Sequence, residues 1–229
     1  MEIISFGDTC LRLRGREGVV AADAFTSIVG PTGRGLTADI ATYSRADDGR
    51  PTLGLDKGSK KGARRRIDGS PVPTSLESAF LLESPGEYEV HEVLMTGVRT
   101  FRDESRGSER GFNTCFVYEL DGLHLIHLGD IGHLLNEDML EEVGTVDVAC
   151  VPVGGSLPVA RAAELVAQLD AKLIVPMPFS GNGAGEGDLR RFLHEMSVQD
   201  TEPVPKLSVT ISSLPQEATV ALLEPRARS

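Results

Sequence analysis

The sequence has few cysteines, and no two of them are close together in the sequence. Cys10, Cys115 and Cys150 lie far apart, each within an apolar segment. A structural zinc site needs closely spaced ligands such as a C-x-x-C pair, and the chain contains no such pair. Three scattered cysteines do not make a disulfide framework either. We therefore expect buried thiols in a reducing compartment and a cytoplasmic protein.

Long apolar runs are also missing. No window approaches the roughly 20 apolar residues that a membrane-spanning helix needs. The N-terminal segment MEIISFGDTC has no basic start followed by an apolar stretch, so no signal peptide is expected. The formal net charge of −11 disfavours nucleic acid and anionic membranes, unless a local basic patch overrides it. We expect neither as a partner, and the sequence does not indicate an oligomeric state.

What is present predicts a layered α/β domain. Hydrophobic residues make up 40% of the chain and charged residues 25%, which is ordinary for a globular protein with a core. Strands come first and then alternate with amphipathic helices, and no second-domain boundary is visible. We expect one domain over 1–229. The strands are predicted at 2–6, 10–14, 19–23, 38–43, 79–82, 88–97, 113–120, 123–128, 148–153, 173–175, 207–211 and 219–223.

Three helices are predicted in the second half of the chain. Asn136 is a suitable N-cap for the first helix, and Gly144 ends it. The other two helices are predicted from apolar residues at the spacing i, i+3, i+4, i+7. These residues are Ala162, Leu165, Val166 and Leu169 in one helix and Leu189, Phe192, Leu193 and Met196 in the other.

Residues 50–75 are predicted to form a flexible basic loop, because they are rich in glycine, proline and serine. Their basic run, Lys57 to Arg66, could bind nucleic acid or another anionic partner. No aromatic residues lie between the charges to stack on bases, so a solvated loop is the favoured interpretation.

The stretch LHLIHLGDIGHL, residues 123–134, contains the best candidate site residue. It begins as a strand and breaks at Gly129, which places Asp130 on the following turn. A carboxylate at the end of a buried strand is well placed for chemistry, because a rigid element aims it into a cleft.

Several motifs in one order resemble the metallo-β-lactamase-fold hydrolases, in the branch of small bacterial proteins described as zinc-dependent hydrolases. The resemblance runs nearly end to end and implies an αββα sandwich, two mixed sheets with helices outside, and an active site along one edge of the sheets. The matching segments are GDTC at 7–10, Asp23, SPGEYEV at 84–90, ERGFNT at 109–114, HLGDIGHL at 127–134, VPVGG at 151–155 and PKLSVTISSLP at 205–215. The loop at 50–75 is longer than the resemblance leads us to expect, so it is interpreted as a flexible basic insertion.

The metal ligands that the resemblance implies are almost all replaced. The family motif His-x-His-x-Asp-His falls on RADDGR, residues 45–50, so its ligands become Arg45, Asp47, Gly49 and Arg50. The two later histidines correspond to Arg102 and Pro178, and only the bridging aspartate is retained, as Asp130. No shift of the alignment restores a histidine near the motif, because none lies between Met1 and Val90.

These replacements predict a degenerate metal site. Arginine keeps its proton, so it cannot donate a lone pair to zinc, and its charge repels a cation. We expect no metal or cofactor, and an arginine paired with the otherwise uncompensated Asp130. The predicted vestigial cleft consists of Arg45, Asp47, Arg50, Arg102 and Asp130.

Other candidate residues have structural interpretations that we favour. His127 and His133 flank Asp130, but neither falls on a ligand position of the family. A magnesium site from Asp47, Asp48 and Asp130 is weighed against a solvated loop plus one ion-paired aspartate. Ser156 lacks the context of a nucleophile and is better explained as a helix N-cap.

Three functions follow. The first is a pseudoenzyme, a non-catalytic member of the fold whose cleft is structural or binds a small anion, since guanidinium groups suit phosphate and carboxylate. The second is a metal-dependent hydrolase with a rebuilt site around Asp130, and zinc would be its cofactor. The third is an interaction protein that uses the basic loop. We favour the first, because fold does not carry function when the site is replaced.

Overall fold

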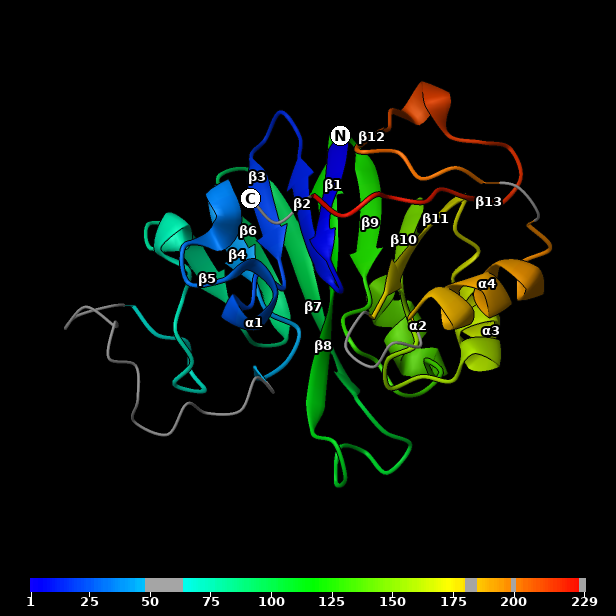
Figure 1. Ribbon diagram of the computed structural model, residues 1–229, viewed down its shortest axis with the longest axis horizontal. Helices are drawn as coiled ribbons and strands as arrows, with labels where there is room; N and C mark the ends of the chain where they lie inside the picture. The colour runs from blue at the N-terminus through cyan, green and yellow to red at the C-terminus, as the bar shows by residue number, and fades with distance from the viewer. Residues whose placement is uncertain (48–63, 180–184, 199–200, 227–229) are drawn as a thin grey trace.

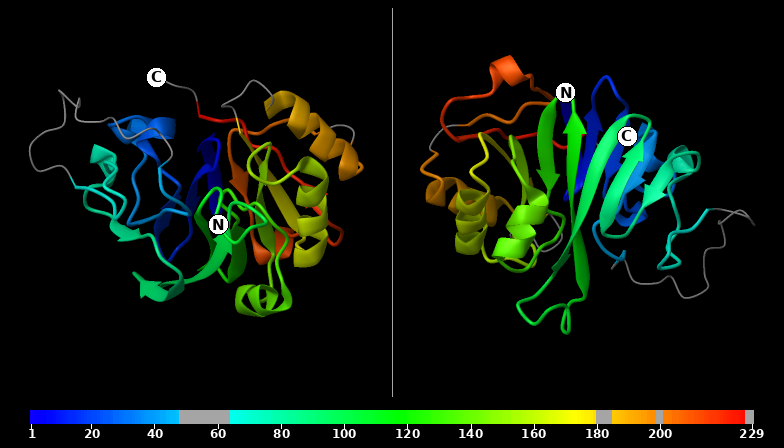
Figure 2. Two further views of the ribbon diagram at one scale, coloured as in Figure 1. Left: turned by 90° about the horizontal axis from the view of Figure 1, so that it is seen from below. Right: turned by 180° about the vertical axis from the view of Figure 1, so that it is seen from behind.

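The computed structural model describes residues 1–47, 64–179, 185–198 and 201–226. Two mixed β-sheets face each other across the middle of the molecule (Figure 1). The view from below in Figure 2 shows helices α2 to α4 gathered on the outer side of one sheet. The predicted α/β fold class, two mixed sheets with helices outside, is confirmed.

The first sheet contains the N-terminal meander. Its order is β12-β1-β2-β3-β4-β5, with antiparallel pairing up to β3 and parallel pairing from β3 to β5. Its strands are β1 (Glu2–Gly7), β2 (Cys10–Arg14), β3 (Val19–Ala22), β4 (Ile40–Thr42), β5 (Phe80–Leu82) and β12 (Leu207–Ser208).

The second sheet has the order β13-β11-β10-β9-β8-β7-β6. Pairing is antiparallel from β6 to β9 and parallel from β9 to β13. Its strands are β6 (Gly86–Val90), β7 (Val93–Phe101), β8 (Phe112–Leu120), β9 (Leu123–His127), β10 (Val148–Val153), β11 (Leu173–Pro178) and β13 (Thr219–Val220).

The three predicted helices all form on the second sheet. They are α2 (Glu137–Val143), α3 (Val159–Leu169) and α4 (Gly185–Glu195). The predicted start and end of α2 are confirmed, since the Asn136 side chain accepts a hydrogen bond from the Met139 N–H and Gly144 is the C-cap. On the outer side of the first sheet, the described residues form three short helical segments: α1 (Thr26–Val29), η1 (Gly33–Gly35) and η2 (Thr74–Leu76).

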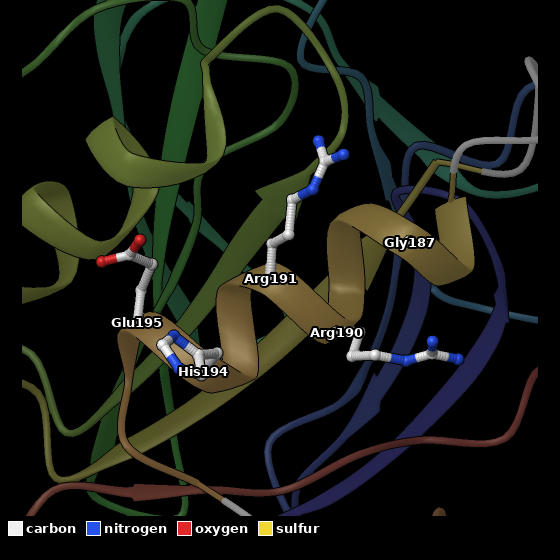
Figure 3. A pocket seen from close by; sticks show the side chains of 5 residues that line it. All are labelled: Gly187, Arg190, Arg191, His194 and Glu195. Carbon is white, nitrogen blue, oxygen red and sulfur yellow. The ribbon is translucent and has the colours of Figure 1, made fainter.

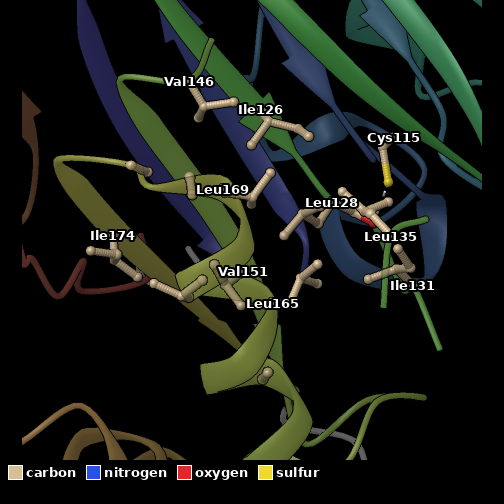
Figure 4. Close-up of a cluster of buried hydrophobic side chains, with 14 of the residues drawn as sticks. Cys115, Ile126, Leu128, Ile131, Leu135, Val146, Val151, Leu165, Leu169 and Ile174 are labelled. Carbon is tan, nitrogen blue, oxygen red and sulfur yellow. Dashed lines mark hydrogen bonds between the residues drawn. The ribbon is translucent and has the colours of Figure 1, made fainter. Parts of the chain in front are cut away.

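Three apolar clusters hold these layers together. One fills the space between the sheets, one lies between the second sheet and α2 to α4, and one covers the outer face of the first sheet. Figure 4 shows Leu165 and Leu169 of α3 packed toward Ile126, Val151 and Ile174. Burying a leucine fully stabilises the fold by about 1.5–3 kcal/mol, so the burial of these two residues helps to dock α3.

One predicted strand is divided in two. The strand predicted at 88–97 is a hairpin, because β6 ends at Val90 and β7 begins at Val93. His91 and Glu92 form the turn with φ values of 51° and 65°. The alternating pattern runs through both strands, and neither turn residue is a glycine or asparagine that would have indicated a reversal. His91 therefore lies in a turn rather than on a strand.

The described part of the predicted flexible insertion has defined contacts. Arg64 donates from Nη1 to the main-chain oxygens of Glu77 and Ala79, and Val72 is buried in the outer cluster of the first sheet. Arg66 is also buried. These contacts differ from the expected solvated basic loop over residues 64–75. Lys57, Lys60 and Lys61 lie outside the described residues.

Candidate functional site

Asp130 lies on the turn after β9, as predicted, and is 3% exposed. The preceding residue Gly129 has φ +62°, and a Cβ there would lie 2.4 Å from Ser44 Cβ and 2.5 Å from Asn113 Oδ1. Only glycine fits this close approach. The turn is also fixed by a hydrogen bond of 3.0 Å from the Asp130 N–H to Asn113 Oδ1.

Both carboxylate oxygens of Asp130 accept hydrogen bonds. Oδ2 accepts from Nε and Nη2 of Arg102, at 3.0 and 2.8 Å. Oδ1 accepts from the main-chain N–H of Ser156 at 2.8 Å. Both Arg102 donors therefore bond to one carboxylate oxygen, and the Ser156 N–H bonds to the other. The structure thus places a guanidinium group against the retained aspartate.

Arg45 is the second arginine at Asp130. Its Nε lies 3.9 Å from Asp130 Oδ2, and its side chain is 11% exposed. The Arg45 guanidinium carbon lies 4.6 Å from the centre of the Phe25 ring, close enough for a cation–π contact. We call Arg45, Arg102 and Asp130 the arginine cluster. Its formal charge is +1, from two guanidinium groups and one carboxylate.

Arg102 also contacts the loop that follows it and the backbone next to Asp130. Its Nη1 donates to the main-chain oxygen of Arg110 at 3.1 Å. A Cβ on Gly132 would lie 2.2 Å from the carbonyl carbon and oxygen of Arg102, so the two backbones are in close contact. The adjacent Asp103 accepts hydrogen bonds from the N–H groups of four loop residues, which are Ser105, Gly107, Glu109 and Arg110.

The Asp103 carboxylate gives this loop a pH dependence. Burial raises the pKa of Asp103, but the four backbone N–H groups outweigh it and hold the pKa below its ordinary value of 3.8. A depressed folded-state pKa means that the carboxylate stabilises the loop above pH 3.8 and loses this effect as the pH falls through the folded-state value.

We therefore expect the amide protection factors of Glu109 and Arg110 to fall when the pH is lowered below 3.8. Hydrogen exchange followed by NMR measures this, with Val151 in β10 as an internal control that should keep its protection. The Asp103→Asn variant should show low protection at Glu109 and Arg110 already at neutral pH. Unchanged protection in this variant would contradict the role given to Asp103.

The other predicted cleft residues have contacts with other groups or lie outside the described residues. Asp47 accepts a hydrogen bond from Ser27 Oγ at 3.0 Å, and its N–H donates to Asp68 Oδ2 at 2.8 Å. Pro178 ends β11, paired with Val153 of β10. Arg50 lies outside the described residues, as does Asp48 of the magnesium alternative.

The two histidines beside Asp130 have structural roles, as predicted. Nε2 of His127 lies 2.7 Å from the main-chain oxygen of Thr9. Nε2 of His133 accepts the Phe101 N–H at 3.0 Å, while its Nδ1 lies 2.6 Å from the Leu134 oxygen. Both ring nitrogens of His133 are thus engaged by backbone groups. His194 is exposed on α4.

The residues around Asp130 do not fit a zinc ion. A zinc site needs three or four lone-pair donors, and here two positive guanidinium groups stand beside one carboxylate whose oxygens already accept hydrogen bonds. Within the described residues, no group of three histidine, cysteine, aspartate or glutamate side chains is close enough to hold a metal.

Ser156 and Asn113 contact Asp130, and these contacts were not predicted from the sequence. Ser156 is not an N-cap, because α3 begins after Pro158 with no side-chain cap. It contributes its N–H to Asp130 instead, and Gly155 permits this because a Cβ there would lie 2.5 Å from Asp130 Oδ1. Asn113 supports the turn from β8. Asn113 lies in the motif ERGFNT, and Ser156 directly follows the motif VPVGG. These motifs were the sequence feature that could have indicated both residues.

A separate hollow lies along α4, lined by Gly187, Arg190, Arg191, His194 and Glu195 (Figure 3). All five of these residues come from one helix, so among the described residues no second element provides an opposing wall. Arg191 is paired with Asp188 at 3.3 Å on the same helix. We treat this hollow as a surface feature of α4.

None of the helices among the described residues is long and apolar enough to cross a membrane.

Known proteins resemble this chain over most of its length. The family model described as the β-lactamase superfamily domain matches residues 2–178. A UPF0173 metal-dependent hydrolase from Thermococcus onnurineus is 32% identical over 99 residues, which is 42% of this chain and 44% of that protein. A second one, from Listeria innocua, is 26% identical over 158 residues, which is 68% of this chain and 60% of that protein. The matches thus span less than two thirds of these curated relatives.

A solved structure gives the same assignment over nearly the whole chain. A predicted zinc-dependent hydrolase of the metallo-β-lactamase superfamily from Thermotoga maritima aligns with a TM-score of 0.67 and 27% identity. The alignment covers 97% of each chain. Together with the family match, the two facing sheets and the position of Asp130, this establishes that the chain belongs to the metallo-β-lactamase superfamily.

Proposed function

We propose that this chain is a non-catalytic member of the superfamily in which the arginine cluster stands in place of the metal centre. The cleft is then structural or binds a small anion. The observation that carries the proposal is the state of Asp130: Arg102 occupies Oδ2 and the Ser156 N–H occupies Oδ1. The carboxylate that would bridge metals is already used to neutralise arginine.

Electrostatics supports the same conclusion. Two unit charges of like sign 4 Å apart repel by about 4 kcal/mol at an intermediate dielectric constant. A divalent ion at Asp130 would lie close to Arg102 and Arg45, so it would have to displace both. The excess positive charge of the cluster instead favours an anion, because guanidinium groups pair well with phosphate and carboxylate.

The anion-binding form of the proposal predicts saturable binding of inorganic phosphate that weakens as salt is added. Isothermal titration calorimetry of the wild-type protein and of Arg45→Gln measures it, and the variant should bind at least about tenfold more weakly. Arg190→Gln is the matched control, because Arg190 is a surface arginine on α4. Equal loss in both variants, or no saturable binding, would contradict a specific anion site.

The alternative is a metal-dependent hydrolase with a rebuilt site around Asp130. The names of the relatives favour it, since the proteins from Thermococcus and Listeria are called metal-dependent hydrolases. It requires Arg102 and Arg45 to leave Asp130 and new ligands to replace them. It predicts turnover of an ester or phosphodiester in the presence of zinc, and loss of that turnover in Asp130→Ala.

A further inference from the structure

Arg66 belongs to the basic segment but is buried. Its Nε donates to Glu83 Oε2 at 3.0 Å, and its Nη1 lies 3.4 Å from Asp68 Oδ2. The side chains of Arg66 and Glu83 are 2% and 8% exposed. Burying an ion pair strips water from two charges, and the attraction between these charges often only offsets that loss. The Arg66–Glu83 pair is therefore expected to add little net stability. The contacts of Arg66 with Arg45 indicate another role.

Two contacts join Arg66 to Arg45. Nη2 of Arg66 donates to the main-chain oxygen of Arg45 at 2.6 Å. Both guanidinium groups also lie over the ring of Phe25, with guanidinium carbons 4.6 Å from its centre for Arg45 and 5.0 Å for Arg66. Phe25 is 1% exposed, so the ring is a fixed support for both side chains.

Carboxylates lie beside both cations on this ring. Two cations on one aromatic ring repel each other, and a nearby carboxylate offsets part of that repulsion. Glu83 lies 3.0 Å from Arg66, and Asp130, which also pairs with Arg102, lies 3.9 Å from Arg45. Tyr43 supports Arg66 further, with the guanidinium carbon 4.0 Å from its ring centre. The segment at 64–70 is thus connected to the arginine cluster through Arg66.

We propose that the Arg66–Glu83 pair positions Arg45 against Asp130, which makes Arg66 a positioning residue of the arginine cluster. The proposal deepens the proposed function, since it names what fixes one of the two arginines that replace the metal. The test measures the Arg45 side chain itself and does not depend on zinc or phosphate binding. A negative result would therefore contradict the role of Arg66 without contradicting the proposed function.

The test is hydrogen exchange at arginine Nε–H groups, measured by NMR on the full chain. Arg66→Lys keeps the charge but loses the planar fork that reaches Glu83 and the Arg45 carbonyl together. We expect the Arg45 Nε–H to exchange about tenfold faster, equivalent to about 1.4 kcal/mol, while the Arg102 Nε–H changes less than about twofold. Arg64→Lys is the matched control, because Arg64 lies in the same segment but donates to Glu77 and Ala79.

The outcomes separate positioning from general destabilisation. Faster exchange at Arg45 alone supports the proposal. Faster exchange at both Arg45 and Arg102, or the same effect in Arg64→Lys, would indicate a loosened fold and overturn it. Unchanged exchange at Arg45 would overturn it as well. Glu83→Gln is a second variant with the same expected result, for use if Arg66→Lys does not fold.

Discussion

The Asp130→Ala variant is expected to lose about 3 kcal/mol of unfolding free energy, because removing one partner of a buried ion pair leaves the other charges uncompensated. Asp130 is 3% exposed, and Arg102 and Arg45 would both remain beside an empty position with side chains 14% and 11% exposed. Urea unfolding measured by circular dichroism gives the difference. An aspartate kept only to hold metal would not stabilise the metal-free protein in this way.

Two further variants test the cause of that loss. Glu164→Ala removes an exposed carboxylate that pairs with Arg161 on α3, and it should cost less than about 1 kcal/mol. Asp130→Ala combined with Arg102→Met should recover part of the stability, because the two changes act on one pair and are not additive. A fully additive double variant would contradict the ion-pair explanation.

The Gly132→Ala variant is expected to be destabilised by about 3 kcal/mol, at the upper end of the range for overpacking. The new Cβ would lie 2.2 Å from the carbonyl carbon and oxygen of Arg102, and these backbone atoms cannot rotate away as a side chain can. The Gly132 N–H also donates to the Phe101 oxygen at 2.8 Å, which ties the two segments together. Relieving the clash must move Arg102 relative to Asp130.

Gly187→Ala is the control for this prediction. A Cβ on Gly187 would meet nothing within 4 Å, and the residue lies inside α4, where alanine is favoured over glycine by about 1 kcal/mol. Urea unfolding should therefore show a neutral or stabilised protein. If Gly132→Ala behaves like Gly187→Ala, the turn and Arg102 are not in the close backbone contact inferred above.

Local patterns were sufficient to predict the layers. The apolar residues of α3 and the continuous runs in β10 and β11 indicate buried elements because burial fixes their periodicity. The turn at His91 and Glu92 was not predicted. Both residues have positive φ, but the alternation of apolar and polar residues does not reveal this backbone conformation.

The candidate site was predictable only in part. Asp130, Arg45 and Arg102 could be found because each falls on a position of the family motif. Arg66 could not, because in the run Arg64-Arg65-Arg66 nothing distinguishes the buried arginine from its neighbours. Ser156 acts through its main-chain N–H, which every residue but proline carries, so its side chain was no guide.

Metal content tests the central claim most directly. The protein is purified without added metal, and bound zinc, iron and manganese are measured by elemental analysis before and after zinc reconstitution and desalting. An arginine cluster in place of the metal centre predicts less than about a tenth of an equivalent after reconstitution. One or two equivalents that disappear in Asp130→Ala would contradict it, and a rebuilt metallohydrolase would become the leading interpretation.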